Sequence, residues 1–341
     1  MSQIAIIGAG AWGTALSIVL GRKQRHQVTL WAYEKQVRDS IEKDRTNAAF
    51  LPQQQIPDGV AVTGNLGDAL RQAEIVVSAM PSQHCRRLFQ EMRPHLHREI
   101  FVVSATKGLE QETLLRMTEV IAISAATENI AVGALSGPSF ASEVARGDPT
   151  AIAIASKDEQ LSSTVQREFS DPAFRVYTND DVVGVELGGA LKNIIAIAAG
   201  VCHGLGLGHN SVAALITRGL AEITRLATAC GGRAETMSGL AGLGDLVLTC
   251  TGGLSRNRSV GVELGRGRKL PEIISSMHGM VAEGVFTTDA AVQLARAHQV
   301  EMPITEQMHA ILNQGKSPAD AIQQLMARTS KRETYLASRT E

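Results

Sequence analysis

The first thirteen residues, MSQIAIIGAGAWG, constrain the fold of this chain more than any other stretch. Residues 4–7 form a short apolar run typical of a buried strand, and helical spacing begins after the glycines. Between the two, Gly8, Gly10 and Gly13 form a GxGxxG motif. In such a unit the glycines permit a tight turn, close approach to a pyrophosphate and close packing of helix on strand. The sequence therefore predicts a dinucleotide site here, with an ordinary strand-to-helix turn as the alternative.

Strands alternate with helices through the first half of the chain. Strand-like runs lie at residues 27–31, 60–63, 74–79, 100–104, 130–135, 150–155 and 175–177, and helical spacing at 66–71, 86–92 and 113–123. This alternation predicts an α/β Rossmann-like domain with a mostly parallel, doubly wound sheet. From about residue 182 the spacing is helical only. We therefore expect a dinucleotide-binding domain over residues 1–185 and an all-α substrate-binding and catalytic domain over residues 186–341.

Composition narrows the class of ligand. The net charge of -1 gives no general attraction to nucleic acid or to an anionic membrane, so an anionic ligand must be held by local groups. The apolar run at residues 196–201 is bracketed too closely by polar residues for an integral membrane span. The four cysteines and nine histidines show no metal-ligand spacing, so no metal site is expected. Unpaired cysteines and a start without signal-peptide features indicate the cytoplasm.

Two glycine-containing stretches follow predicted strands and carry polar side chains. Lys107 lies in SATKG directly after one strand, and ligands of open α/β sheets bind beyond the carboxyl ends of strands. The alternative is a solvated surface lysine. Gly137 and Ser139 lie in SGPSFA after another strand, where backbone N–H groups and a hydroxyl could bind a phosphate or a carboxylate. A structural turn is the alternative there.

Two further stretches lie in the predicted helical domain. Lys192 precedes an almost wholly apolar run, and desolvation together with Lys107 would lower its pKa and make it a proton donor. A lysine that snorkels out of an apolar helix is the alternative. Asp245 lies in GLGDLVLT, and Ser255, Arg256 and Asn257 follow in a cluster before a predicted helix. Guanidinium, amide and helix N-terminus together would bind a phosphate, whereas a simple N-cap would not need the whole cluster.

Taken together, these stretches resemble the NAD(P)-dependent sn-glycerol-3-phosphate dehydrogenase family, the soluble type that reduces dihydroxyacetone phosphate. The resemblance covers nearly the whole chain, through GAGAWG, SATKGLE, GPSFASEV, ELGGALKN, GLAGLGDLVLTC, SRNRSVG and VAEGV in that order. The family has a Rossmann-like domain followed by a helical domain. The resemblance therefore implies reversible hydride transfer between NAD(P)H and dihydroxyacetone phosphate. It also implies that the product is a precursor for glycerophospholipid synthesis.

The resemblance also implies residue roles. Lys192 would be the catalytic acid/base, Lys107 would hold the substrate and polarise its oxygen, and Asp245 would contact the substrate and orient both lysines. The implied substrate contacts are Lys107, Gly137, Ser139, Lys192, Asp245, Ser255, Arg256 and Asn257. The expected cofactor contacts are Gly8, Gly10, Ala11, Trp12, Gly13, Tyr33, Lys107, Ala141, Arg256, Val281 and Glu283.

The chain departs from the family pattern at two places that concern the cofactor. Ala11 stands where bacterial members often have serine, which removes one hydroxyl from the pyrophosphate site. At the end of the second strand, members that use NADPH often carry Arg or His, but this chain has Tyr33 and Glu34. Glu34 would accept a hydrogen bond from a ribose hydroxyl, so the expectation is NAD rather than NADP. Binding of a 2′-phosphate by the nearby Arg38 and Lys35 is the alternative, and it would favour NADP.

Two other functions fit parts of the pattern. A 3-hydroxyacid dehydrogenase also sets a lysine-bearing helix against a Rossmann domain, but a phosphate pocket at residues 255–257 argues against it. A nicotinamide-sensing binding protein without turnover would keep the glycine turn, yet it has no need for Lys107, Lys192 and Asp245 together. The apolar helices of the second domain are expected to support a homodimer.

Overall fold

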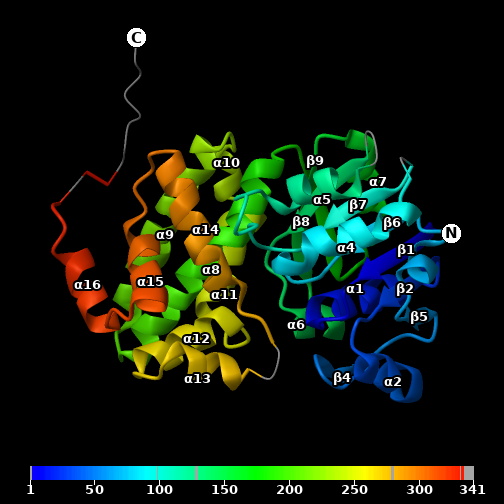
Figure 1. Cartoon of the computed structure of the whole chain (residues 1–341), viewed down its shortest axis with the longest axis horizontal. Helices are drawn as coiled ribbons and strands as arrows, with labels where there is room; N and C mark the ends of the chain where they lie inside the picture. The colour runs from blue at the N-terminus through cyan, green and yellow to red at the C-terminus, as the bar shows by residue number, and fades with distance from the viewer. Residues whose placement is uncertain (1, 98, 127–129, 278–279, 331, 334–341) are drawn as a thin grey trace, which may run out of the picture.

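The structure, a computed structural model, describes residues 2–97, 99–126, 130–277, 280–330 and 332–333. Figure 1 shows two halves side by side, one a sheet flanked by helices and the other a bundle of helices. The sheet half comes first in the chain, in blue to green, and the helical half follows. The predicted fold class, a Rossmann-like sheet domain followed by a helical domain, is confirmed.

The main sheet has eight strands in the order β10-β9-β8-β7-β6-β1-β2-β5. Their bounds are β1 Ser2–Ile7, β2 His26–Trp31, β5 Val60–Thr63, β6 Ile75–Ser78, β7 Phe101–Ser104, β8 Ala131–Ser136, β9 Thr150–Ser156 and β10 Phe174–Asn179. Neighbouring strands are parallel except for the antiparallel pair β8 and β9. Every run that the sequence marked as strand-like forms a strand, the weak one at residues 175–177 included.

The direction of winding reverses at β1. The chain first adds β2 and β5 on one side of β1, then returns to place β6 and β7 on the other. In register, Ile4 of β1 pairs with Val28 of β2 on one side and with Ile75 of β6 on the other. Such a reversal leaves a crevice at the carboxyl ends of the strands, where α/β proteins bind ligands. The glycine motif follows β1 directly and therefore lies at this crevice.

Helices cover both faces of the sheet. They are α1 Ala11–Gly21, α2 Lys35–Asp44, α3 Leu66–Leu70, α4 Cys85–Met92, α5 Met117–Ala125, α6 Ala141–Arg146 and α7 Glu159–Phe169. Alternate residues of β1 serve the two faces, because strand side chains point to opposite sides. Ile6 packs in the core that contains Leu16 of α1, and Ile7 in the core that contains Phe89 of α4. The sheet is buried on both sides, as a parallel sheet requires.

The helical half is built around α8, Val182–Gly204. Around it lie α9 His209–Ala229, α10 Ala234–Met237, α11 Asp245–Thr251, α12 Arg256–Gly265, α13 Leu270–Ser275, α14 Glu283–Ala297, α15 Pro303–Gln314 and α16 Pro318–Met326. By length and composition α8 would suffice to cross a membrane, but 94% of its most apolar window is buried inside the protein. A helix that is apolar all round is typical of a core position. Its two acidic or basic residues, Glu186 and Lys192, are both paired.

Several elements of the first half were not predicted. The helices α2, α6 and α7 and a small antiparallel hairpin, β3 Thr46–Asn47 with β4 Leu51–Gln55, carry too few apolar residues to show a clear period. In α2, for example, only Val37 and Ile41 are buried. The predicted helix at residues 113–123 was wrong at its start. Residues 109 and 116 instead form an isolated antiparallel bridge, and the helix α5 begins at Met117.

Candidate active site

A buried carboxylate joins two lysines from different halves of the protein. Lys107 follows β7, Lys192 lies in the middle of α8, and Asp245 begins α11. The Lys107 Nζ donates to Asp245 Oδ2 at 2.6 Å, and the Lys192 Nζ donates to Asp245 Oδ1. Each carboxylate oxygen thus accepts from a different lysine. We call these three residues the lysine–carboxylate centre.

The pairing explains how Asp245 stays charged without water. Asp245 is 1% exposed, and burial by itself would raise its pKa. The ammonium groups of Lys107 and Lys192 outweigh burial and hold the pKa of Asp245 below its usual value. A buried ionised carboxylate is tolerated only when such partners compensate for lost solvation. The charges therefore fix the two lysines about one carboxylate.

Lys192 is poised to exchange a proton near neutral pH. Burial lowers the pKa of Lys192 to about 7, Asp245 opposes this shift, and Lys107 adds to it. Thr249, which the sequence reading missed, accepts from the Lys192 Nζ at 2.7 Å and donates to the Asp245 backbone carbonyl at 2.6 Å. Thr249 lies four residues after Asp245 on α11, so it shares a face with the carboxylate. That spacing was the signal available in the sequence.

The loop after β8 adds a backbone acceptor to the centre. The Lys107 Nζ donates to the Gly137 carbonyl at 3.1 Å, and the Ser139 hydroxyl donates to the same carbonyl at 2.9 Å. Gly137 has φ of 143°, and a Cβ there would come within 2.8 Å of the Ile152 Cα, so only glycine fits. The structure thus brings Gly137 and Ser139 to Lys107, and the binding of an anion by this loop stays a prediction.

The cluster at residues 255–257 is tied to the lysine-bearing helix. Ser255 caps α12 by accepting from the Arg258 N–H at 3.2 Å. Asn257 donates to the side-chain oxygen of Asn193 at 3.0 Å and accepts from the Gly284 N–H at 3.0 Å. Asn193 directly follows Lys192, so these contacts place the start of α12 beside the lysine–carboxylate centre. Asn193 is a second residue that the sequence reading did not single out.

Arg256 begins α12 and lies near the Glu283 carboxylate. The residue is exposed, but the surrounding protein desolvates its guanidinium and lowers its pKa, while the Glu283 carboxylate opposes that shift. Glu283 begins α14 and reaches the sheet half, where it accepts from the Ser82 N–H at 3.1 Å and the Ser82 hydroxyl at 2.7 Å. No hydrogen bond or ion pair engages the Arg256 guanidinium within the described part of the chain. The Arg256 guanidinium is thus available to donate hydrogen bonds to an anionic ligand.

The glycine motif has the shape of a dinucleotide turn. Gly8 has φ of 115°, and a Cβ there would lie 2.7 Å from the Ala79 carbonyl oxygen that follows β6. A Cβ on Gly13 would collide with the Gly8 carbonyl, whereas one on Gly10 would meet nothing within 4 Å. The helix α1 then begins at Ala11 with no side-chain cap. Its first N–H groups are therefore left to an anion. The Trp12 indole N–H is buried and has no hydrogen-bond partner among the described residues.

The end of β2 carries an arginine. Tyr33 is 69% exposed, and its ring lies 6.1 Å from that of Trp31. The Arg38 Nη1 donates to the carbonyls of Ala32 and Tyr33 at 2.7 and 2.8 Å. Lys35, by contrast, is paired with Asp39 at 2.7 Å. Arg38 is thus the basic group held at this strand end.

The two remaining residues of the predicted cofactor set are apolar. Ala141 begins α6 and packs against the core beneath α1, and Val281 lies two residues before Glu283. Neither side chain has a hydrogen-bonding atom, so their part in cofactor binding stays a prediction.

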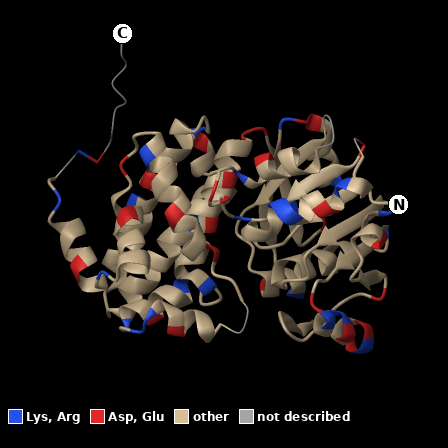
Figure 2. Ribbon diagram, in the orientation of Figure 1, with Lys and Arg blue, Asp and Glu red and all other residues tan. Residues whose placement is uncertain are grey.

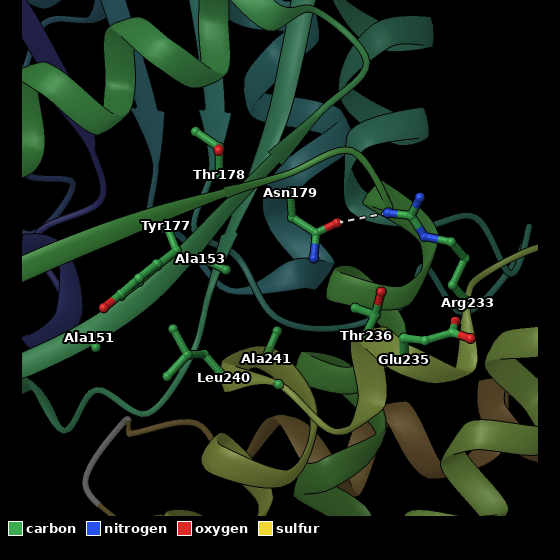
Figure 3. A pocket seen from close by; sticks show the side chains of 11 residues that line it. Ala151, Ala153, Tyr177, Thr178, Asn179, Arg233, Glu235, Thr236, Leu240 and Ala241 are labelled. Carbon is green, nitrogen blue, oxygen red and sulfur yellow. Dashed lines mark hydrogen bonds between the residues drawn. The ribbon is translucent and has the colours of Figure 1, made fainter.

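A cavity of about 690 Å³ lies away from these residues, along β9, β10 and α10. Figure 3 shows its lining, with Arg233 donating to the Asn179 side-chain oxygen at 3.2 Å and Leu240 and Ala241 on the opposite wall. It contains none of the predicted site residues. In Figure 2 positive and negative residues are interspersed over both halves. A ligand anion must therefore be bound by specific groups such as Lys107 and Arg256.

Comparison with known proteins finds matches to glycerol-3-phosphate dehydrogenases along nearly all of the chain. A model of the NAD-dependent glycerol-3-phosphate dehydrogenase N-terminus matches residues 3–162, and one of the C-terminus matches residues 181–323. The chain is 68% identical to glycerol-3-phosphate dehydrogenase [NAD(P)+] of Koribacter versatilis over 98% of this chain and 100% of that protein. It is 53% identical to the enzyme of that name from Acidobacterium capsulatum, over 98% and 100% respectively.

A solved structure agrees with these sequences. The crystal structure of glycerol-3-phosphate dehydrogenase from Coxiella burnetii has a TM-score of 0.91 and 41% identity, and the match covers 96% of this chain and 99% of that one. These matches cover nearly all of the chain, and the chain belongs to the NAD-dependent glycerol-3-phosphate dehydrogenase family of oxidoreductases.

Proposed function

We propose that this protein catalyses reversible hydride transfer between NAD(P)H and dihydroxyacetone phosphate, giving sn-glycerol 3-phosphate. The observation that carries the proposal is the lysine–carboxylate centre, in which a buried Asp245 holds Lys107 and Lys192. Relatives named for this activity support it. We further propose that the protein acts in the cytoplasm and supplies glycerophospholipid synthesis, and that the two domains divide at residue 185.

The residues around α1 fit a dinucleotide. The turn offers a diphosphate the Gly10 N–H, which has no backbone acceptor among the described residues, and open space beside Gly10. The buried Trp12 indole N–H also has no hydrogen-bond partner in the described part of the chain. When bound, the nicotinamide supplies the hydride to the carbonyl carbon of the substrate. Lys107 belongs to the sheet half and Arg256 and Glu283 to the helical half, where Glu283 contacts Ser82 across the boundary. We propose these three residues as cofactor contacts together with Ala141 and Val281.

Lys192 supplies the proton that the reaction needs. As an ammonium group it donates to the substrate carbonyl oxygen as that oxygen gains negative charge, and in the reverse direction the neutral amine removes the proton. Lys107 stabilises the developing oxyanion, because its ammonium is already oriented by Asp245 and by the Gly137 carbonyl. Preoriented donors need no rearrangement during the step, which is why a fixed centre accelerates it.

The phosphate group of the substrate is proposed to lie at the start of α12. Arg256 offers a guanidinium fork, Asn257 a side-chain amide and the helix its N-terminal N–H groups. Ser255 is engaged as the N-cap, so its hydroxyl fixes the helix start and presents the other two groups. A phosphate ester requires such an anion pocket, which favours this substrate over a simple 3-hydroxyacid.

Arg38 bears on the choice between NAD and NADP. Its Nη1 is held by two strand-end carbonyls, and no described residue accepts from its other nitrogens. An arginine at the end of the second strand is suited to a ribose 2′-phosphate. We therefore propose that the protein accepts both NADH and NADPH, in place of the preference for NAD that Glu34 suggested.

A partly exposed helical face supports a homodimer. None of the first ten residues of α9 is fully buried in one chain: Ala213 and Ala214 are exposed, and Leu215 and Ile216 pack only partly against the core, whereas Ile223, Leu226 and Ala227 in the second half of α9 are buried in it. Val247 of the adjacent α11 is 41% exposed. Exposed apolar surface of this kind marks association sites, and we propose a second copy of the chain as the occupant.

Oxidation of NADH and NADPH should be measured in parallel with dihydroxyacetone phosphate. We expect turnover with both, and replacement of Lys192 by Ala should lower kcat by at least about 100-fold while NADH still binds. Binding of NADH by the wild-type protein without turnover would indicate a nicotinamide-sensing binding protein instead of an enzyme. Turnover of 3-oxoacids but not of dihydroxyacetone phosphate would indicate a 3-hydroxyacid dehydrogenase.

The pH dependence of reduction should report Lys192. The ammonium form is the acid, so kcat/KM for dihydroxyacetone phosphate should fall as pH rises through about 7, and glycerol 3-phosphate oxidation should rise there. Asp245 raises the pKa of Lys192, so the Asp245→Asn variant should move the falling limb to lower pH and lose activity. A limb that moves to higher pH in that variant would contradict this assignment.

Replacing Arg256 by Ala should raise the KM for dihydroxyacetone phosphate by about 10- to 100-fold, because a charged donor to the phosphate is lost. Initial rates at saturating NADH measure this. Arg266 lies just beyond the other end of α12 and pairs with Glu263, so Arg266→Ala is the matched control and should leave KM within about twofold. An unchanged KM in Arg256→Ala would remove the phosphate site from α12.

Sedimentation velocity should show that the wild-type protein is a dimer. The Val247→Arg variant should be a monomer, because the substitution places a charge within the proposed apolar contact between the two copies. Met326 is 81% exposed at the end of α16, away from this face, and Met326→Arg is the control that should leave the dimer intact. A wild-type monomer across the accessible concentrations would refute the proposal.

A further inference from the structure

A wholly buried asparagine connects the β3–β4 hairpin to the glycine turn. Asn47 lies in β3 and is 0% exposed. Its Nδ2 donates to the Ala9 carbonyl at 2.7 Å and to the Thr14 hydroxyl at 2.8 Å. Its Oδ1 accepts from the Phe50 N–H at 3.1 Å. Both ends of the amide have partners of fixed polarity, so its orientation is determined.

The contact with Ala9 sets the direction of the next N–H group. The Ala9 carbonyl and the Gly10 N–H belong to one peptide group, and in a trans peptide they point in opposite directions. No described peptide bond is cis. Because Asn47 draws the Ala9 carbonyl into the protein interior, the Gly10 N–H must point away from it.

The side to which that N–H points is open. A Cβ on Gly10 would meet no atom within 4 Å, and Gly10 occupies the N-cap position of α1 without any side-chain cap. No backbone acceptor is given for the Gly10 N–H in the described residues. A rotated Ala9–Gly10 peptide would present a carbonyl oxygen there instead, and a carbonyl repels an anion.

We propose that Asn47 is a positioning residue for the dinucleotide diphosphate, holding the Ala9–Gly10 peptide so that its N–H faces the phosphate oxygens. The inference rests on the proposed function, because it assumes that the cofactor binds at this turn. It also assigns a role to the hairpin, which belongs to neither the main sheet nor the lysine–carboxylate centre. Asn47 acts on cofactor affinity and not on proton transfer at Lys192.

The test is the effect of Asn47→Ala on NADH affinity and on turnover, measured by fluorescence titration and by steady-state kinetics. We expect the Kd and KM for NADH to rise at least about tenfold, while kcat at saturating NADH and the KM for dihydroxyacetone phosphate change less than about twofold. General damage to the fold would instead alter kcat and both KM values together.

Ser40→Ala is the matched control. The Ser40 hydroxyl also holds this hairpin, donating to the Thr46 carbonyl at 2.7 Å and accepting from the Ala48 N–H at 3.2 Å, and among the described residues it makes no hydrogen bond to Ala9. If loosening the hairpin were enough, Ser40→Ala would weaken NADH binding as much as Asn47→Ala. That result would overturn the proposal, as would an unchanged Kd in Asn47→Ala.

Asn47→Asp provides a second, pH-dependent measurement. An ionised carboxylate cannot donate to the Ala9 carbonyl, whereas a protonated carboxyl can. NADH affinity of this variant should be weak at about pH 8 and should recover towards about pH 5, relative to the wild-type protein at each pH. No recovery would count against the proposal. If neither variant folds, amide exchange at Gly10 in the wild-type protein decides: slowing by NADH supports the assigned N–H direction, and no slowing overturns it. Failure of the wild-type protein to bind NADH would refute the proposed function instead.

Discussion

The arrangement of the two halves depends on one carboxylate that water hardly reaches. Asp245 is stable as an anion only while Lys107 and Lys192 both donate to it, and these lysines come from a loop of the sheet half and from the core helix of the helical half. A shift of one half against the other would leave a charge unpaired in the interior. Docking of the two halves therefore also assembles the lysine–carboxylate centre.

Two further carboxylates act across the same boundary. Glu186 of α8 accepts from the Thr118 N–H at 2.8 Å and pairs with Arg116, which fixes the start of α5. Glu283 accepts from Ser82 at the other end of the contact. Each joins a side chain of the helical half to backbone N–H groups of the sheet half. Glu186 thus holds α8 against the sheet half, and Glu283 holds the start of α14 against it.

The sequence predicted the structure well at positions where a single physical requirement decides the residue type. The glycines at positions 8 and 13 are required by close backbone contacts, and α8 is apolar all round because protein surrounds it, so both could be predicted. The hairpin that carries Asn47 could not. Its residues neither alternate nor repeat, and its importance comes from a single amide that meets Ala9, 38 positions earlier in the chain. Thr249 and Asn193 were missed for a related reason, since polar residues in helices are usually unremarkable until a partner across the fold is known.

The position of Lys192 fits the role proposed for it in both directions of the reaction. A lysine in water is almost entirely protonated at neutral pH and could act only as an acid. Burial in α8 lowers the pKa of Lys192 to about 7, and Asp245 prevents it from falling further. Both the ammonium and the amine are then present near neutral pH, and in the proposed mechanism the first serves reduction and the second serves oxidation. The opposition between desolvation and a single ion pair thus sets the balance, and that opposition exists only while the helix is buried and the domains are docked.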